Sequence, residues 1–178
     1  MFFTLTSQQK DKPIQDYKKA IEALKAVDPT QPYDNKFFNA LARLTVSVAI
    51  EAVCLRLNRS SEALEVFMTQ RGPNEAYAGQ WHCPGSVLRS EEDIEDVFKR
   101  LESKEFGATI LSHKFVVNIN NPKEERGHFF SVVYLCDIED SSLTGGEWFP
   151  VNQLPKNTAW HHAQIMIPAV AKEFSSKA

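Results

Sequence analysis

The sequence of 178 residues lacks the features that mark two large classes of protein. No stretch approaches the roughly 20 consecutive apolar residues that a membrane-spanning helix requires. Basic residues are not in excess, because 20 Lys and Arg stand against 23 Asp and Glu and give a net charge of −3. Domains that bind nucleic acid usually carry a basic excess. We therefore expect neither a membrane nor a nucleic acid as a partner.

Cysteine is also scarce. The three cysteines, Cys54, Cys83 and Cys136, lie far apart and form no Cys-x-x-Cys pair. This spacing argues against a disulfide framework and against a structural zinc site. The apolar part of the N-terminal stretch MFFTLTSQQKDK is too short for a signal peptide. We therefore expect a protein of the reducing cytoplasm.

The composition is that of a globular protein. Hydrophobic residues make up 43% and charged residues 24% of the chain, and 12 Phe, 3 Trp and 4 Tyr can fill a sizeable core. The length fits one domain with a short appendage.

The appendage is expected at residues 1–35. A helix that begins near Pro13 would place Tyr17, Ile21 and Leu24 on one face, and the prolines of DPTQP (28–32) would end it. This apolar face must pack either on the main domain, residues 36–178, or on a second subunit in a homodimer.

The main domain alternates between strand patterns and helix patterns. Residues 45–71 predict two strands, with a bulge or bend where the alternation slips near Ala52–Val53. A helix is expected over residues 91–105, capped by Ser90 with Asp93 as its reciprocal partner. It should pack on the sheet through the apolar residues at helical spacing, Ile94, Val97, Phe98 and Leu101.

Two further strands are predicted at 108–119 and 128–138, joined by a charged loop at 120–127. A short strand follows at 146–150. A C-terminal helix is predicted at 160–174, with Pro168 either kinking it or lying in its first turn after a break. This order predicts an α+β fold, an α/β/α sandwich in which helices flank a mixed sheet.

The segment from Val66 to Ala108 contains the most informative motif. Its sequence is VFMTQRGPNEAYAGQWHCPGSVLRSEEDIEDVFKRLESKEFGA. It resembles the Nudix hydrolases (MutT-like proteins), whose signature is G-x5-E-x7-R-E-U-x-E-E-x-G-U, with U an aliphatic residue. The similarity extends over roughly residues 45–175. It implies the Nudix fold, hydrolysis of a diphosphate linkage in a nucleoside diphosphate derivative, and substrate-binding roles for Arg71, Trp81 and Gly85.

The signature can be aligned in two registers. Alignment on Gly107 places Ser86 at the first glycine, Glu92 at the first glutamate and Arg100 at the arginine. Alignment on Gly85 instead places Glu91 at the first glutamate and leaves no carboxylate at the metal positions. We prefer the first register, because it retains the arginine and the closing glycine without a gap.

In the preferred register the second half of the signature is degenerate. Leu101 replaces one glutamate, Glu102 stands at the aliphatic position, and Lys104 and Glu105 stand at the glutamate pair. Hydrolysis of a diphosphate needs a divalent cation with several oxygen ligands. Leu101 offers no oxygen and is expected close to the cleft, where it would seal the place of the missing carboxylate with apolar surface. Lys104 places a positive charge where a cation would bind.

Two functions remain open at this point. In the first, the chain is a weak hydrolase, with Arg100 and Glu105 as catalytic residues and with Glu105, Glu102 and Glu92 as ligands of Mg²⁺ or Mn²⁺. In the second, the fold is a non-catalytic module that binds a nucleotide, a metabolite or another protein. The acidic residues from 91 to 96 also suit the solvated first turn of a helix, with no role in chemistry.

Overall fold

The computed structural model describes residues 15–139 and 143–176, and the chain divides into two compact units, Met1–Pro32 and Tyr33–Ala178. In the first unit, α1 (Gln15–Lys25) carries Tyr17, Ile21 and Leu24 as exposed side chains. The expected helix start at Pro13 lies outside the described residues. The second unit begins just before the expected boundary at residue 35, and Asp34 belongs with it as a helix cap.

A short helix that the sequence patterns did not predict opens the second unit. This helix, α2 (Asn35–Ala42), is capped by the Asp34 side chain, which accepts hydrogen bonds from Lys36 N and Phe37 N. Its Ala42 packs with Phe129 in a small cluster of buried residues. The cap and the following Phe-Phe pair were the available sequence signal for this helix.

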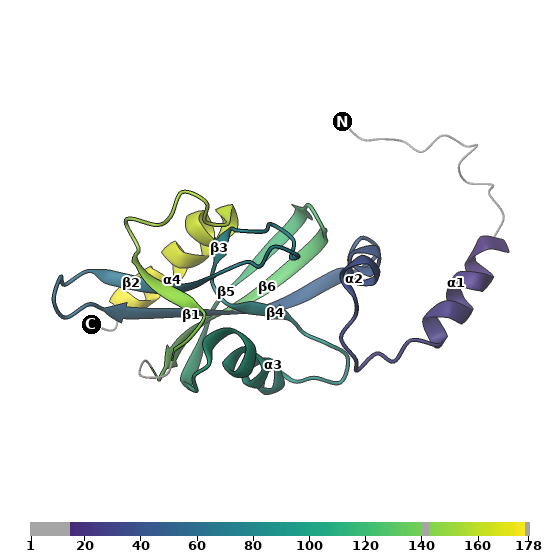
Figure 1. Cartoon of the computed structure of the whole chain (residues 1–178), viewed down its shortest axis with the longest axis horizontal. Coiled ribbons are helices and arrows are strands. Elements are labelled where there is room, and N and C mark those ends of the chain that lie inside the picture. The colour runs from purple at the N-terminus through teal and green to yellow at the C-terminus, as the bar shows by residue number, and fades with distance from the viewer. Residues whose placement is uncertain (1–14, 140–142, 177–178) are drawn as a thin grey trace. The chain divides into compact units, whose positions relative to one another are not determined.

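The core of the second unit is a seven-stranded mixed sheet in the order β3-β2-β1-β6-β5, with β4 paired to β1 and β7 paired to β2 (Figure 1). The parallel pair is β1 with β6. The strands are β1 (Val46–Leu57), β2 (Leu64–Gln70), β3 (Trp81–His82), β4 (Gly85–Val87), β5 (Ile110–Glu124), β6 (Gly127–Ile138) and β7 (Gly146–Pro150). The predicted α+β class with a mixed sheet is confirmed.

Strand β1 is buried on both faces, and this explains the slip in its alternation. Ile50, Ala52 and Cys54 belong to one core cluster, whereas Val53 and Leu55 belong to another. The pairing of β1 with β6 runs without a register shift from Val46 to Cys54. The expected bulge near Ala52–Val53 is therefore absent from this pairing, and the slip in alternation reflects the apolar residues that a strand covered on both faces needs.

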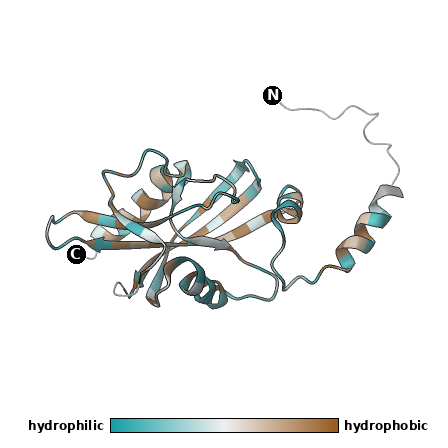
Figure 2. Ribbon diagram, viewed as in Figure 1, coloured by the Kyte–Doolittle hydropathy of each residue, from teal (hydrophilic) through white to brown (hydrophobic). Residues whose placement is uncertain are grey.

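Helices cover the two faces of the sheet (Figure 1). One face packs on α3 (Ile94–Leu101), which continues as a π-helical turn, η2 (Glu102–Phe106). The other packs on the C-terminal helix, formed by the π-helical η4 (His162–Met166) and α4 (Ile167–Ser175). Hydrophobic residues follow the central strands, whereas the visible side of α3 is mainly hydrophilic (Figure 2). The prediction that α3 packs through Ile94, Val97, Phe98 and Leu101 is confirmed.

The start of α3 differs from the expected one. Asp93 is the N-cap and forms a capping box with Asp96, so Ser90 does not cap the helix. Glu91 has a left-handed φ of 65°, and Arg89 N donates to Glu92 Oε2 at 2.9 Å. These residues form a turn, and the helix therefore begins about one turn later than predicted.

Two further expectations concern the second half of the domain. The charged stretch 120–127 was expected as a loop, but β5 continues to Glu124 and leaves a tight turn before Gly127. Pro168 lies in the first turn of α4, one of the two places expected for it, where a missing N–H costs little. Within residues 15–139 and 143–176, no helix is long and apolar enough to cross a membrane.

Candidate functional site

An ion pair holds the first half of the signature together. Arg100 donates from Nε to Glu92 Oε1 and from Nη2 to Glu92 Oε2, each at 2.7 Å. The same guanidinium donates to Ser86 Oγ and to Val87 O, and so it ties α3 to β4. Burial acts to raise the pKa of Glu92, but the hydrogen bonds from Arg100 and from the backbone of Arg89 lower it on balance. Arg100 and Glu92 thus position the helix.

The closing glycine supports the same register. Gly107 has a left-handed φ of 63° and ends η2, with its N–H donating to Glu102 O at 2.8 Å. A Cβ at Gly107 would lie 2.2 Å from Thr144 Oγ1. The left-handed backbone and the nearby Thr144 side chain thus favour glycine at position 107.

The second half of the signature does not assemble a cluster of carboxylates. Leu101 is 1% exposed and lies in the core, not at the edge of a cleft as expected. Glu102 Oε1 accepts a hydrogen bond from Ile110 N at 2.7 Å and so fixes the start of β5. Lys104 is exposed.

Glu105 is the residue of this half that faces other polar groups. Thr69 Oγ1 donates to Glu105 Oε2 at 3.3 Å. Burial raises the pKa of Glu105, as does the nearby charge of Glu75, while Thr69, Arg71 and Lys104 oppose the rise. Its carboxylate is thus half-buried among groups of both signs.

The three predicted metal ligands have separate partners. Glu92 binds Arg100, Glu102 binds the backbone of β5, and Glu105 binds Thr69. In the described part of the chain, no three His, Cys, Asp or Glu side chains form a group that could hold a metal ion. The residues present do not fit a preformed site for Mg²⁺ or Mn²⁺, which favour several oxygen ligands.

A second carboxylate, Glu51, lies on β1 beside Gly85. Glu51 is 8% exposed, and Ser131 Oγ donates to its Oε1 at 3.3 Å. Burial raises the pKa of Glu51 to about 7, against the opposing charge of Arg71. A Cβ at Gly85 would lie 1.9 Å from Glu51 Oε2, so the glycine makes room for this side chain. The sequence signal for Glu51 was an acidic residue inside a strand of apolar residues.

Among the predicted substrate-binding residues, Arg71 has a side chain with a hydrogen-bond donor that lacks an acceptor within residues 15–139 and 143–176. Its side chain is 19% exposed, and its Nε is buried without a hydrogen-bond partner in the described part of the chain. Nη1 lies 3.9 Å from Glu75 Oε2. Burial lowers the pKa of Arg71, and so does the charge of Arg126, while Glu51, Glu75 and Glu105 raise it. Arg71 is therefore a cation with donors to spare.

The remaining predicted residue, Trp81, is a packing residue. Its ring meets Phe149 edge-on at 4.8 Å between centroids, and it borders the core cluster under α4. Its backbone accepts from Ala159 N at 2.8 Å and donates to Asn157 O at 3.1 Å. Trp81 thus anchors the segment before the C-terminal helix.

Two buried histidines near Arg71, His82 and His162, are neutral. Burial lowers the pKa of His82 to about 3 and that of His162 well below its usual range. His162 Nδ1 accepts from Cys83 N at 3.2 Å, and His82 Nε2 lies 3.3 Å from Thr69 Oγ1. They therefore add polarity next to Arg71 without adding positive charge.

The sequence patterns also did not predict a cluster of four residues, Tyr77, Glu124, Arg126 and Phe129. Arg126 Nε donates to Glu124 Oε1 at 2.8 Å, Tyr77 donates to the same oxygen, and the Arg126 guanidinium lies over the Tyr77 and Phe129 rings. The cluster joins the tip of the β5–β6 hairpin to the loop after β2.

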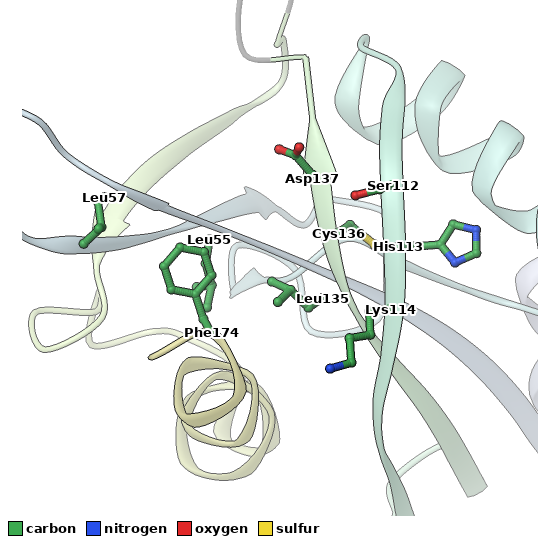
Figure 3. Close-up of a pocket in the computed structure, with 9 residues that line it drawn as sticks. All are labelled: Leu55, Leu57, Ser112, His113, Lys114, Leu135, Cys136, Asp137 and Phe174. Atoms are coloured by element: carbon green, nitrogen blue, oxygen red, sulfur yellow. The ribbon is translucent and has the colours of Figure 1, made fainter. Parts of the chain in front are cut away.

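A separate pocket of about 670 Å³ lies between the end of β1, strands β5 and β6, and α4 (Figure 3). Leu55, Leu135 and Phe174 form its apolar side. Lys114 on its polar side is paired with Glu173, and His113 with Glu95. None of the predicted site residues lines it.

Comparison with known proteins is consistent with the signature. The model of the NUDIX domain matches residues 48–169. ADP-ribose pyrophosphatase of Methanocaldococcus jannaschii is 30% identical over 101 residues, which are 52% of this chain and 59% of that protein. The match thus spans less than two thirds of the length of that relative.

Solved structures share the fold. Shewanella oneidensis NrtR has a TM-score of 0.59 at 21% identity, with 73% of this chain and 63% of that chain covered. Its NUDIX domain, crystallised with ADP ribose, has a TM-score of 0.56 at 22% identity, with 86% and 97% covered. A MutT NUDIX hydrolase from Burkholderia pseudomallei has a TM-score of 0.57 at 18% identity, with 71% and 98% covered.

Proposed function

The chain belongs to the NUDIX domain family, and we propose that it binds a nucleoside diphosphate derivative such as ADP-ribose and hydrolyses it slowly at most. Hydrolysis would consume one water, which attacks a phosphorus atom of the diphosphate and breaks the bridging P–O bond. The products from ADP-ribose would be AMP and ribose 5-phosphate.

The observation that carries this proposal is the contrast within the signature. The ion pair that positions the helix is intact, with four hydrogen bonds from Arg100 to Glu92, Ser86 and Val87. The carboxylates that would bind a cation are replaced by a core leucine and an exposed lysine. The chain keeps the ion pair that positions the helix but lacks the carboxylates that would bind a cation. This combination favours binding of the nucleotide derivative over its rapid hydrolysis.

Binding of a diphosphate is supported by Arg71 and Arg126. These two guanidinium groups lie within electrostatic reach, since Arg126 lowers the pKa of Arg71. A diphosphate between them would reduce their mutual repulsion and accept hydrogen bonds from the guanidinium of Arg71, whose Nε has no partner in the described part of the chain. The names of the ADP-ribose pyrophosphatase relative and of the NrtR complex point to ADP-ribose as the first ligand to test.

Slow turnover is supported by the different partners of the three predicted metal ligands, because Glu92 binds Arg100 and Glu102 binds the backbone of β5, which leaves Glu105. We propose Glu105 as the catalytic carboxylate, because it is half-buried beside Thr69 and near Arg71. Arg100 would act as a positioning residue through Glu92. Glu92 and Glu102 already have strong partners, so we derive no step through a protein-held metal site.

The experiment compares the binding and the turnover of ADP-ribose. We expect ADP-ribose to raise the melting temperature. Turnover with Mg²⁺ or Mn²⁺ should lie orders of magnitude below the roughly 1–10³ s⁻¹ typical of enzymes. Glu105→Gln, which keeps the shape and removes the charge, should lower turnover further, whereas Glu147→Gln, at the exposed position of β7, should not.

Each outcome has a defined meaning. Turnover near about 10 s⁻¹ would contradict slow hydrolysis. Binding without any release of AMP would favour the non-catalytic module. Failure of ADP-ribose to bind would contradict the proposed function as a whole.

A further inference from the structure

A pocket of about 420 Å³ lies beside the tip of the β5–β6 hairpin. It is lined from three directions: Tyr77 and Gln80 come from the loop after β2, Glu124 comes from the end of β5, and Trp160 and His161 come from the start of the C-terminal helical segment. No sequence motif identified it, because its walls come from segments far apart in the chain.

Glu124 is the unusual residue of this pocket. Its side chain is 6% exposed, and Oε1 accepts hydrogen bonds from Tyr77 Oη at 2.5 Å and from Arg126 Nε at 2.8 Å. The other oxygen, Oε2, is buried without a hydrogen-bond partner in the described part of the chain. Buried polar atoms are nearly always paired, so a buried carboxylate oxygen without a donor indicates a missing partner.

The aromatic residues suit a flat ligand. Trp160 is 70% exposed although it borders the pocket, so its ring is available for stacking. Tyr77 adopts a left-handed φ of 60°, which is unfavourable for a tyrosine and is maintained by its contacts with Glu124 and Arg126. A planar ring with N–H donors on its edge would satisfy both Trp160 and Glu124 Oε2.

The pocket lies next to the two arginines proposed to bind the diphosphate. Arg126 Nε donates to Glu124, which lines the pocket, and Arg71 N donates to the carbonyl oxygen of Gln80, another lining residue, at 3.0 Å. His161 lines the pocket and lies within electrostatic reach of Glu124, Arg71 and Arg126. A ligand with its diphosphate at Arg71 and Arg126 would therefore place its nucleoside end near Trp160.

We propose that this pocket binds the nucleobase of the ligand, with the base stacked on Trp160 and an exocyclic amino group donating to Glu124 Oε2. This inference rests on the proposed function and narrows it to amino-bearing bases such as adenine. A base with a carbonyl at the same position, such as hypoxanthine, would turn an acceptor towards the carboxylate.

The test is the binding of ADP and IDP to the full chain, measured by calorimetry. Native protein should bind ADP at least about tenfold more tightly than IDP, the usual scale for a hydrogen bond to a charged group. Glu124→Gln should reduce this ratio below about threefold, because an amide can both donate and accept. Glu147→Gln, the matched control on β7, should keep the native ratio.

A second variant covers the case in which Glu124→Gln does not fold. Trp160→Ala changes an exposed side chain and should weaken ADP and IDP alike by about tenfold or more. ADP should quench tryptophan fluorescence in the native chain and much less in Trp160→Phe.

The outcomes separate this inference from the function on which it rests. Suppose that ADP-ribose binds but the native chain has nearly equal affinities for ADP and IDP. The proposed base pocket is then wrong, and the proposed function stands. The same conclusion follows if Glu124→Gln and Trp160→Ala both leave binding unchanged. If neither ADP-ribose nor ADP binds, both are overturned.

Discussion

The two halves of the signature segment, residues 86–100 and residues 101–107, differ in what their polar side chains do. In the first half, Glu92 and Arg100 bind each other with two short hydrogen bonds and join the helix to β4. In the second half, Leu101 is in the core, Glu102 caps a strand and Lys104 faces solvent. A motif can thus be kept for the geometry of a fold after the residues for cation binding have been replaced. Three substitutions test this contrast, and a fourth, at Glu51, tests the buried carboxylate of β1.

The largest effect is expected from Leu101→Glu. Because Leu101 is 1% exposed among apolar residues, a glutamate there would need to bury a polar or charged group without a partner. We expect a loss of about 4 kcal/mol or more in the free energy of unfolding, measured with urea. Leu101→Met, a control of similar volume, should cost less than about 1.5 kcal/mol. A stable Leu101→Glu variant would place this position at the cleft after all.

Arg100→Ala should have the next largest effect. The substitution leaves the half-buried Glu92 carboxylate without its counter-ion and Val87 O without its donor, and we expect a loss of about 2–3 kcal/mol. Lys99→Ala, at the adjacent exposed position, should change stability by less than about 0.5 kcal/mol. Equal losses of stability in the two variants would show that the ion pair between Arg100 and Glu92 does not stabilise the fold.

Glu51→Gln should change the dependence of stability on pH. The pKa of Glu51 is raised to about 7 in the folded chain, so the folded state retains this proton better than the unfolded state. Native stability should therefore fall as pH rises from about 4.5 to 7. Relative to native protein, Glu51→Gln should gain about 2 kcal/mol between pH 5 and pH 8. Glu147→Gln should show no such trend, and parallel curves for native protein and Glu51→Gln would contradict the burial of a charge on β1.

The smallest effect is expected from Lys104→Glu. Lys104 is exposed, so the free energy of unfolding should change by less than about 0.5 kcal/mol. The new carboxylate next to Glu105 should raise the affinity for Mn²⁺ by about threefold to tenfold in calorimetry. Lys104→Gln should give an intermediate value, since it removes the repulsion without adding a ligand. No gain in either variant would mean that Glu105 does not face a cation-binding position.

Local patterns predicted the elements whose packing follows from their own sequence. The two strands within residues 45–71 and the apolar face of α3 are of this kind, since the alternation of β-branched residues and the spacing of Val97, Phe98 and Leu101 specify them. The same spacing that places Leu101 in the core argues against its expected position in the cleft. The structure showed that Leu101 could not both pack in the core and line the cleft.

The missed site residues depend on partners that are distant in sequence. Glu124 belongs to a charged stretch that suits a solvated hairpin tip, and its burial follows from Tyr77, which is 47 residues away. Glu51 was visible as an acidic residue in an apolar strand, but its place beside Gly85 depends on the pairing of β1 with β4. Sequence patterns describe which residues are unusual, whereas the topology decides which of them meet.

The pairing of β1 also has a consequence for how the chain acquires its structure during synthesis. Residues Val46–Cys54 pair in parallel with His128–Cys136, so a nascent chain cannot complete its central strand until most of the domain has left the ribosome. Contacts so distant in sequence are formed late and slow the search for the native state. Until then the apolar stretch from Ile50 to Leu55 remains open to chaperones and to aggregation. Amide protons of β1, once paired on both sides, should be among the last to exchange with solvent deuterium.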